Sequence, residues 1–444
     1  MFDKFCKNIF ILFVTLITNS CTSDDILSSE VPNVIQSENI YLLHNKWIFS
    51  QMNRNYYWRT EMPDSLSCDY STDPVTFYKS LLSKKDRFSY CENNPSYTGI
   101  SELANYGFEY QNYTLRDISF SQILYVLNED VKKQGLRRGD IFQFLDNNRI
   151  SRGIIDKDKF IPSDTFLLSK NPLDDNKSVY MDSIYSEGDN RIGYICYLKF
   201  EDKNELEPIL KKFWENNIDE LILDLRYNPG GYVNTCKYLA NSIVSENGYG
   251  KVFQYCTYND ILSEEMLKLT GNEKSVSMYS TPNNGVGLLG SSLYGLNLKR
   301  LFVITSKYSA SASEATIICL KPFMDVIIIG EQTYGKGVGS WTIRDNRFKY
   351  QIQPITMRYH NANMETTPDD GIPVDYFMED GYSTSKKELG DVNEPLLNKA
   401  ISIINNNDKQ TRVANNNEQV NHDIKAIGTP SYFKIKTNNY ENNF

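Results

Sequence analysis

Histidine is scarce in this chain of 444 residues, which contains only His44, His360 and His422. A serine nucleophile usually takes its base from a nearby histidine, so this scarcity favours a different base. The sequence has no Cys-x-x-Cys pair and no histidine-rich spacing, so it predicts neither a metal site nor a cofactor. The net charge is −9 without a strong basic block, which argues against nucleic acid as the main partner.

A short apolar stretch, NIFILFVTLITNSC, follows two lysines near the N-terminus and ends at Cys21. It is too short for a membrane-spanning helix and is typical of a signal peptide over residues 1–21. A cysteine directly after the apolar run resembles a bacterial lipoprotein cleavage site, although Thr18 and Asn19 depart from its usual residues. We therefore expect an exported protein, lipid-anchored through Cys21 in the cell envelope at the outer membrane or cell surface, with a polar tether over residues 22–35. A plain secretory signal and a periplasmic location are the alternative.

Export would permit disulfides, and six cysteines remain after the signal peptide: Cys68, Cys91, Cys196, Cys236, Cys256 and Cys319. Cys196 and Cys319 lie in apolar runs and are expected to be buried thiols. Cys68 and Cys91 flank one N-terminal segment and are candidates for a disulfide, but the spacing alone leaves the connectivity open.

The chain divides into regions of different pattern, and the length is typical of two or three domains. Residues 36–103 have aromatic helical faces and predict a small helical N-terminal domain. Residues 104–187 alternate like strands and predict a β-rich domain. From residue 191 strands alternate with amphipathic helices, which predicts an α/β core over 188–404. We expect an α/β multidomain protein, with a loose, Asn-rich tail over residues 405–444.

The stretch GLRRGDIFQFLDNNRIS in the β-rich region resembles a PDZ domain, in which a Gly-Leu-x-x-Gly-Asp motif precedes a strand. Such domains bind the C-terminus of a peptide by adding it as a strand to a sheet edge. Tyr106, Gly107 and Phe108 match the loop that would hold the terminal carboxylate. An ordinary β-rich insertion is the alternative reading.

The motif SASASE, residues 309–314, follows the predicted strand LFVITS and opens a predicted helix. Backbone N–H groups at a helix N-terminus lack intrahelical partners and favour negative charge. A serine nucleophile there would find an oxyanion donor in the amide of the next residue. Helix capping and close packing explain serines at this position equally well.

Two further candidate stretches lie where predicted buried strands end. QTYGKG places Lys336 after the strand DVIIIGE, where burial would lower the pKa of a lysine and make its amine a general base. DLRYNPGG ends a strand with Gly230 and Gly231, whose lack of a Cβ lets backbone approach a substrate closely. A solvent-exposed lysine and an ordinary tight turn are the structural alternatives.

Together DLRYNPGG, SASASE and GEQTYGKG resemble, in this order, the motifs of the carboxyl-terminal processing, or tail-specific, serine proteases. The resemblance spans residues 104–380 and implies a serine endopeptidase of exported proteins with a Ser–Lys dyad. It implies Ser311 as nucleophile and Lys336 as base. The oxyanion hole would use the amide of Ala312 and that of Gly230 or Gly231.

The same resemblance assigns supporting roles. Ser309 and Ser313 would pack or cap, Glu314 would be structural, and Asp224 with Arg226 would brace the strand end. The substrates would be proteins or peptides, bound through their C-termini.

The sequence departs from the family pattern at two positions. Ser340 stands where many members have a glutamine that holds the lysine, and Tyr308 stands where a small residue is common. A catalytically idle, PDZ-bearing peptide-binding lipoprotein is the alternative from another class. An exported esterase with His360 as its base is a third reading, and a His360→Gln substitution would separate it from a Ser–Lys enzyme.

Overall fold

The computed structural model describes residues 38–93, 106–146, 148–168, 177–187, 190–201, 203–270, 292–345, 347–348, 350–405, 423–433 and 435. The expected signal peptide, Cys21, the tether and most of the tail lie outside the described residues. Tyr41–Phe444 forms one compact unit. In the part of the chain that is described, every helix is too short or too polar to cross a membrane.

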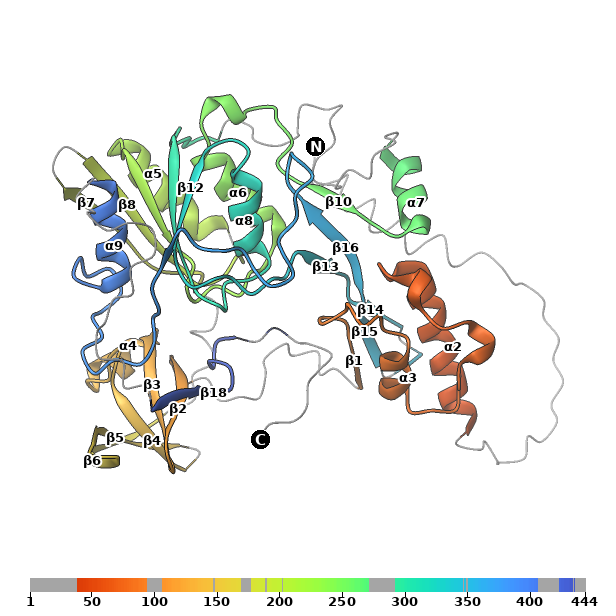
Figure 1. Cartoon of the computed structure of the whole chain (residues 1–444), viewed down its shortest axis with the longest axis horizontal. Helices are drawn as coiled ribbons and strands as arrows, with labels where there is room; N and C mark the ends of the chain where they lie inside the picture. The colour runs from red at the N-terminus through yellow and green to blue at the C-terminus, as the bar shows by residue number, and fades with distance from the viewer. Residues whose placement is uncertain are drawn as a thin grey trace, which may run out of the picture. The chain divides into compact units, whose positions relative to one another are not determined.

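A six-stranded mixed sheet forms the centre of the α/β core, with the strand order β17-β12-β11-β9-β8-β7 (Figure 1). Its strands are β7 (Val179–Glu187), β8 (Asn190–Tyr197), β9 (Glu220–Asp224), β11 (Arg300–Thr305), β12 (Asp325–Gly330) and β17 (Tyr376–Phe377). β8, β9, β11, β12 and β17 are parallel to one another, whereas the edge strand β7 is antiparallel to β8. Parallel neighbours need crossover connections, which helices supply between β8 and β9, β9 and β11, and β11 and β12.

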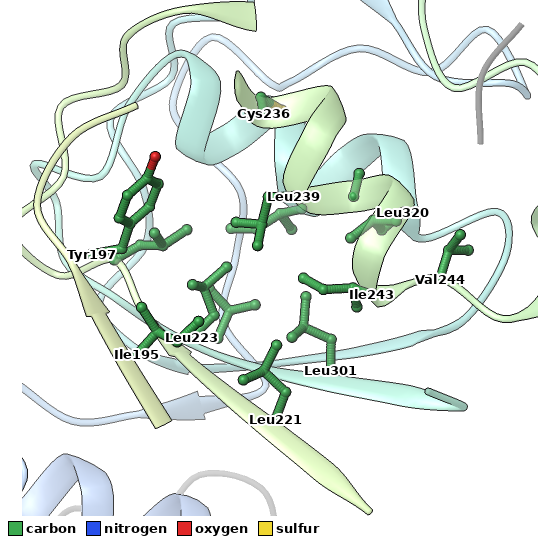
Figure 2. Close-up of a cluster of buried hydrophobic side chains, with 14 of the residues drawn as sticks. Ile195, Tyr197, Leu221, Leu223, Cys236, Leu239, Ile243, Val244, Leu301 and Leu320 are labelled. Carbon is green, nitrogen blue, oxygen red and sulfur yellow. The ribbon is translucent and has the colours of Figure 1, made fainter. Parts of the chain in front are cut away.

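Helices cover both faces of this sheet, as the alternating pattern of the sequence predicts. These helices are α5 (Leu206–Glu215), α6 (Val233–Ile243), α8 (Ala312–Leu320) and α9 (Pro395–Ile404). A further helix, α7 (Asp260–Thr270), instead forms ion pairs with the N-terminal region, between Asp260 and Arg59 and between Glu265 and Arg54. One apolar cluster joins α5, α6 and α8 to the sheet, and a second joins α9 to its other face. Figure 2 shows the first cluster, where Leu221 and Leu301 of the strands lie beneath Leu239 and Ile243 of α6.

A second six-stranded sheet forms the β-rich domain, with the order β18-β2-β3-β4-β5-β6. Its elements are β2 (Phe108–Leu115), β3 (Ile118–Val126), α4 (Glu129–Lys133), β4 (Ile141–Asp146), β5 (Arg149–Asp156), β6 (Lys159–Leu167) and β18 (Ile424–Ile427). Strand β18 comes from the C-terminal region, which we expected to be loose. Its described residues instead pair with β2 and pack against the core.

The N-terminal region is helical but also contributes a strand. It contains α2 (Glu38–Asn55) and α3 (Pro74–Ser80), followed by β1 (Tyr90–Asn93). β1 pairs with β15 (Tyr350–Gln353), which also pairs with β14 (Ile343–Arg344). A further sheet has the order β10 (Tyr255–Thr257), β16 (Ile355–His360) and β13 (Val338–Ser340). Short 3₁₀ turns are η1 (Arg59–Glu61), η2 (Ser65–Ser67), η4 (Lys203–Glu205) and η5 (Glu246–Gly248).

The mixed α/β architecture with N-terminal helices confirms the expected fold class, but two details differ. Residues 179–187, expected in the β-rich domain, form β7 of the core sheet because they pair with β8. Cys68 and Cys91 are free thiols rather than a disulfide: Cys91 is buried in β1, whereas the Cys68 thiol donates to the Asp64 carbonyl oxygen.

Candidate active site

Ser311 stands at the turn between β11 and α8, directly before the first helical residue. Its backbone has φ 57° and ψ −111°, a conformation that a non-glycine residue adopts only where its surroundings impose it. Such strain is characteristic of functional turns. The side chain of Ser311 is partly exposed, whereas the following residue, Ala312, is buried.

Hydrogen bonds from neighbouring serines hold this strained turn against the end of β9. The Ser309 hydroxyl donates to the Leu225 carbonyl at 2.8 Å, and the Ser313 hydroxyl donates to the Asn228 carbonyl at 2.9 Å. Both serines are fully buried. Their hydroxyls therefore join the SASASE turn to the DLRYNPGG strand end.

Glu314 joins the serine turn to the lysine loop. Its Oε2 accepts hydrogen bonds from the backbone N–H groups of Ser311 and Lys336, both at 2.8 Å. Its Oε1 accepts from the Gly335 amide at 2.7 Å and from the Thr333 hydroxyl at 2.6 Å. Burial raises the pKa of Glu314 above its usual value, and the four donors oppose part of this rise because they favour the carboxylate.

Lys336 follows β12 in a loop that the N-terminal region covers. Arg87 donates to the Gly335 carbonyl at 2.6 Å, and the Lys336 ammonium lies 5.5 Å from the centre of the Phe88 ring. Loss of water around the amine lowers the pKa of Lys336 to about 8, against the opposing effect of the Glu314 charge. About a tenth of the amine is therefore neutral at pH 7, far more than in an exposed lysine, and only this neutral form can act as a general base.

The Asn-Pro-Gly-Gly turn lies against Ser311. A Cβ added to Gly230 would come to 2.8 Å from the Ser311 Cβ and 3.0 Å from the Ala312 amide nitrogen. The Gly230 N–H donates to Asn228 Oδ1 at 2.9 Å. Among the described residues, the amides of Gly231 and Ala312 have no hydrogen-bond acceptor. These two N–H groups, rather than that of Gly230, are the candidates for an oxyanion hole.

A buried charge cluster supports the strand end that leads to these glycines. Arg226, with no exposed surface, forms ion pairs with Asp224 at 2.8 Å and Glu394 at 2.6 Å. Arg138 of the β-rich domain pairs with Asp380 at 2.8 Å, and Asp380 also accepts a hydrogen bond from the Tyr227 hydroxyl. This cluster links the β-rich domain to the residues just before the glycine turn.

The positive charges of this cluster control the ionisation of Asp380. Burial alone would raise the pKa of Asp380, but the charges of Arg138 and Lys386 hold that pKa well below its usual range. Asp380 is therefore ionised and tied to cations of both the β-rich domain and the core.

A cleft of about 480 Å³ opens beside the glycine turn and includes Gly231 and Ser340 in its wall. Aromatic and apolar side chains, among them Trp341 and Met357, line it together with Glu201 and Lys203. Ser340, the residue in place of the expected glutamine, accepts a hydrogen bond from Gln353 Nε2 at 2.8 Å. The cleft could therefore receive a substrate side chain next to Gly231, one of the two candidate oxyanion donors.

Tyr106, Gly107 and Phe108 stand at the start of β2. Tyr106 and Phe108 are buried in the core of the β-rich domain. The carbonyl of Gly107 accepts from the amides of Leu127 and Asn128 at 2.8 and 2.9 Å. This loop is thus tied to the end of β3, and its side chains serve packing.

The two described histidines lie in other surroundings. His360 Nε2 is 2.9 Å from the Thr257 hydroxyl, and Nδ1 is 3.3 Å from the Met364 carbonyl. Both ring nitrogens thus have partners outside the serine turn. His44 is buried and its ring packs against Phe348 and Tyr350. Neither arrangement supports a histidine base for Ser311.

Sequence reasoning missed two contributions to this site. Glu314 was predicted to be structural without any named partner, and it contacts both the candidate nucleophile and the candidate base through their backbones. Arg87 and Phe88 belong to the N-terminal region and reach the lysine loop. The glutamate was visible inside the SASASE motif, whereas no local pattern connected residues 87–88 to residue 336.

Models of protein families match two parts of the chain. Peptidase family S41 matches residues 191–377, and the Peptidase S41 N-terminal domain matches residues 44–90. Together the two matches span more than half of the chain. The larger match contains both Ser311 and Lys336, and the smaller one contains Arg87 and Phe88.

The chain is also similar, over part of its length, to curated proteins. The "Probable CtpA-like serine protease" of Staphylococcus aureus (strain N315) is 25% identical over 164 residues, which are 36% of this chain and 28% of that protein. The protein of the same name from Staphylococcus epidermidis (strain ATCC 35984) is 25% identical over 198 residues, 44% of this chain and 33% of that protein. The matches therefore span about a third or less of these relatives.

The solved structure of a "Putative S41 protease from Bacteroides fragilis NCTC 9343" superimposes with a TM-score of 0.67. It is 22% identical in sequence and covers 86% of this chain and 100% of that one. At this level of identity, the likeness shows a shared fold.

Proposed function

Since the chain belongs to peptidase family S41, we propose that it is a serine peptidase in which Ser311 is the nucleophile and Lys336 the general base. The observation that carries this proposal is the shared carboxylate of Glu314. One oxygen of Glu314 accepts the backbone N–H groups of both residues, although they are 25 positions apart in the sequence.

The reaction begins with the transfer of the Ser311 hydroxyl proton to the neutral amine of Lys336. The serine oxygen attacks the carbonyl carbon of the scissile peptide bond and forms a tetrahedral intermediate. The amides of Ala312 and Gly231 stabilise its oxyanion. When the intermediate collapses, the C–N bond breaks and the ammonium of Lys336 protonates the leaving amine.

Deacylation repeats these steps with water. Lys336 takes a proton from a water molecule, which attacks the acyl-enzyme ester and releases the new carboxylate. Ser311 then recovers its proton from the lysine. The cleft beside Gly231 supports this scheme because it offers space for a substrate side chain next to that oxyanion donor.

The proposed substrates are exported proteins or peptides, engaged through their C-termini. The β-rich domain would contribute by PDZ-like strand addition, with Tyr106, Gly107 and Phe108 forming its terminal loop. Lipid anchoring through Cys21 would keep the enzyme at the cell envelope, at the outer membrane or cell surface. The ion pair between Arg138 and Asp380 supports a connection between the β-rich domain and the catalytic strand end.

The test compares the full chain with its Ser311→Ala and Lys336→Ala variants, using an unfolded protein with an apolar C-terminus as substrate. We expect both variants to lose hydrolysis by about a thousandfold or more, since each removes a reacting group. A Lys299→Ala variant at an exposed position is the control and should keep full activity.

Binding of the same substrate is measured in parallel. If the wild-type chain does not hydrolyse the substrate but still binds its C-terminus, the proposal is wrong. The chain would then be a catalytically idle peptide-binding protein. Activity retained by Lys336→Ala would contradict the assignment of the base.

A further inference from the structure

The C-terminal tail of the chain follows a continuous path from the edge of the β-rich domain to the candidate active site. We call its described residues 424–433 the tail segment. Its first part, β18, runs antiparallel to β2, with Ile424 opposite Leu115 and Ile427 opposite Asn112. β18 forms the edge of the sheet, so it occupies the position that an added peptide strand would take on β2.

The pairing continues beyond β18 through Ser431. The Ser431 N–H donates to the Tyr110 carbonyl at 2.9 Å, and its hydroxyl accepts from the Tyr110 N–H at 2.8 Å. The Ser431 hydroxyl also donates to the Glu109 carboxylate. The tail segment thus uses both polar groups of the Tyr110 backbone and leaves no place there for another peptide.

The tail segment then places two aromatic side chains beside the catalytic loops. Tyr432 and Phe433 are each only 8% exposed. The Phe433 ring centre lies 5.0 Å from that of Tyr308 and 5.0 Å from that of Tyr334. The Tyr432 ring packs edge-on against Tyr308, with the centres 6.3 Å apart.

The two tyrosines that contact Phe433 lie just before the two residues of the candidate dyad in the sequence. Tyr308 is three residues before Ser311, and Tyr334 is two residues before Lys336. The Tyr334 N–H donates to the Ser309 carbonyl at 3.0 Å, which joins the two loops at this point. Tyr308 and Tyr334 therefore form an aromatic cradle at the rim of the candidate site. Tyr308 is also the residue that departs from the small one common in the family.

We propose that this aromatic cradle is a binding site for a large apolar or aromatic side chain of a peptide substrate, and that the tail segment is its built-in competitor. The proposal rests on the proposed peptidase function. A substrate would pair its extended backbone with β2 and seat such a side chain between Tyr308 and Tyr334. It must first displace residues that belong to the same chain.

The size of the competition follows from the contacts. An aromatic pair contributes about 0.5–1.5 kcal/mol beyond the area that it buries, and Phe433 forms two such pairs. Strand β18 adds backbone hydrogen bonds over four residues. A substrate can bind the same surface only in those molecules whose tail segment has dissociated from β2 and from the cradle. The apparent affinity of the substrate is reduced by the fraction of such molecules.

The first test is a binding experiment that needs no catalysis. A fluorescent peptide with the sequence of residues 423–435 is titrated into the full chain carrying Ser311→Ala, with either the native tail or Phe433→Ala. We expect the peptide to bind about tenfold more tightly to the Phe433→Ala chain, because the internal competitor is weakened. Thr429→Ala, an exposed change in the same tail, is the matched control and should leave the affinity unchanged.

Two further variants test the cradle itself. Tyr308→Ala and Tyr334→Ala, each combined with Phe433→Ala, should abolish the gain in peptide binding. A peptide in which this phenylalanine is replaced by alanine should bind the Phe433→Ala chain no more tightly than it binds the chain with the native tail. Equal affinity for native and Phe433→Ala chains would overturn the proposal. If Phe433→Ala does not fold, as judged by its melting temperature, Phe433→Leu replaces it, because it keeps an apolar side chain without the ring.

Kinetics separate competition from a purely structural role. In the chain with Ser311 intact, Phe433→Ala should lower KM by about tenfold and leave kcat unchanged. A structural role would instead lower kcat and the melting temperature together, and that result would overturn the proposal. If no variant hydrolyses the substrate, the peptidase function fails, whereas the peptide titration still decides whether the tail segment competes for the cradle.

Discussion

Ser311 and Lys336 donate their backbone N–H groups to one and the same atom, Oε2 of Glu314, each at 2.8 Å. The carboxylate also holds Gly335 and Thr333 through its other oxygen. Two loops that follow different strands, β11 and β12, are thereby fixed to a single buried group. The relative positions of Ser311 and Lys336 therefore depend on a carboxylate that takes no part in the proposed reaction.

Replacement of Glu314 by glutamine tests this positioning role. A glutamine amide has one acceptor oxygen, and its NH₂ group would face N–H donors, so at least two donors would lose their acceptor. Each such buried group costs about 1–3 kcal/mol of unfolding free energy. We expect Glu314→Gln to lower the denaturant midpoint and to reduce kcat by about a hundredfold or more, as for loss of a positioned group.

Glu215→Gln at the exposed end of α5 serves as the control, because it removes the same charge where no such donors converge. Wild-type stability and kcat in Glu314→Gln would contradict the positioning role. If Glu314→Gln lowers stability but leaves kcat unchanged, Glu314 stabilises the fold without positioning the dyad.

The pH dependence of hydrolysis reports on Lys336. Burial lowers its pKa to about 8, and only the neutral amine accepts the serine proton. We therefore expect kcat/KM to rise with pH through an apparent pKa near 8 and to level off above it. Because the Glu314 charge raises the pKa of Lys336, any residual activity of Glu314→Gln should show this rise at lower pH. A rise centred near the pKa of an exposed lysine would contradict a desolvated base.

The same lysine couples stability to pH. Its pKa is lower in the folded chain than the usual value of 10.5, so the unfolded chain binds more protons between about pH 8 and 10.5. The free energy of unfolding contributed by Lys336 therefore increases as the pH rises through this window. Lys386, whose pKa burial also lowers to about 8, contributes in the same direction. Denaturant titrations of wild type and Lys336→Met over this range should show a smaller increase in the variant.

Local patterns were enough to predict much of the fold. The strands β8, β9, β11 and β12 are apolar runs bounded by turn residues, and α5 has a clear apolar face, so each could be read from its own sequence. The three motifs also lie at the ends of strands in the order that the α/β alternation predicts. Their convergence follows because the carboxyl ends of parallel strands meet at one edge of a sheet.

Features that depend on distant partners could not be read in this way. β7 alternates like a strand of the β-rich domain, and only its pairing with β8 assigns it to the core sheet. Arg138 lies in the GLRRGD motif, where nothing local indicates an ion pair with Asp380, 242 positions away. The composition of the tail predicted looseness, but pairing of β18 with β2 outweighs that preference in the described part.

The final prediction concerns the glycine turn. Gly231 has φ +143°, and a Cβ there would come to 2.3 Å from the Phe200 carbonyl oxygen. Gly231→Ala must therefore move the backbone that carries the candidate oxyanion donor. We expect kcat to fall by about 10²–10³-fold, as for removal of one oxyanion-hole donor. Steady-state kinetics on the unfolded substrate, with the melting temperature measured in parallel, checks this expectation.

Gly250→Ala is the matched control, because Gly250 also has positive φ, +74°, but an added Cβ meets nothing within 4 Å. It should cost about 1 kcal/mol in backbone strain and leave kcat unchanged. If Gly231→Ala keeps the wild-type kcat while folded, its amide does not bind the oxyanion. The Gly230 N–H would then have to leave Asn228 Oδ1 during the reaction, and Asn228→Ala, which frees that amide, should raise kcat rather than lower it.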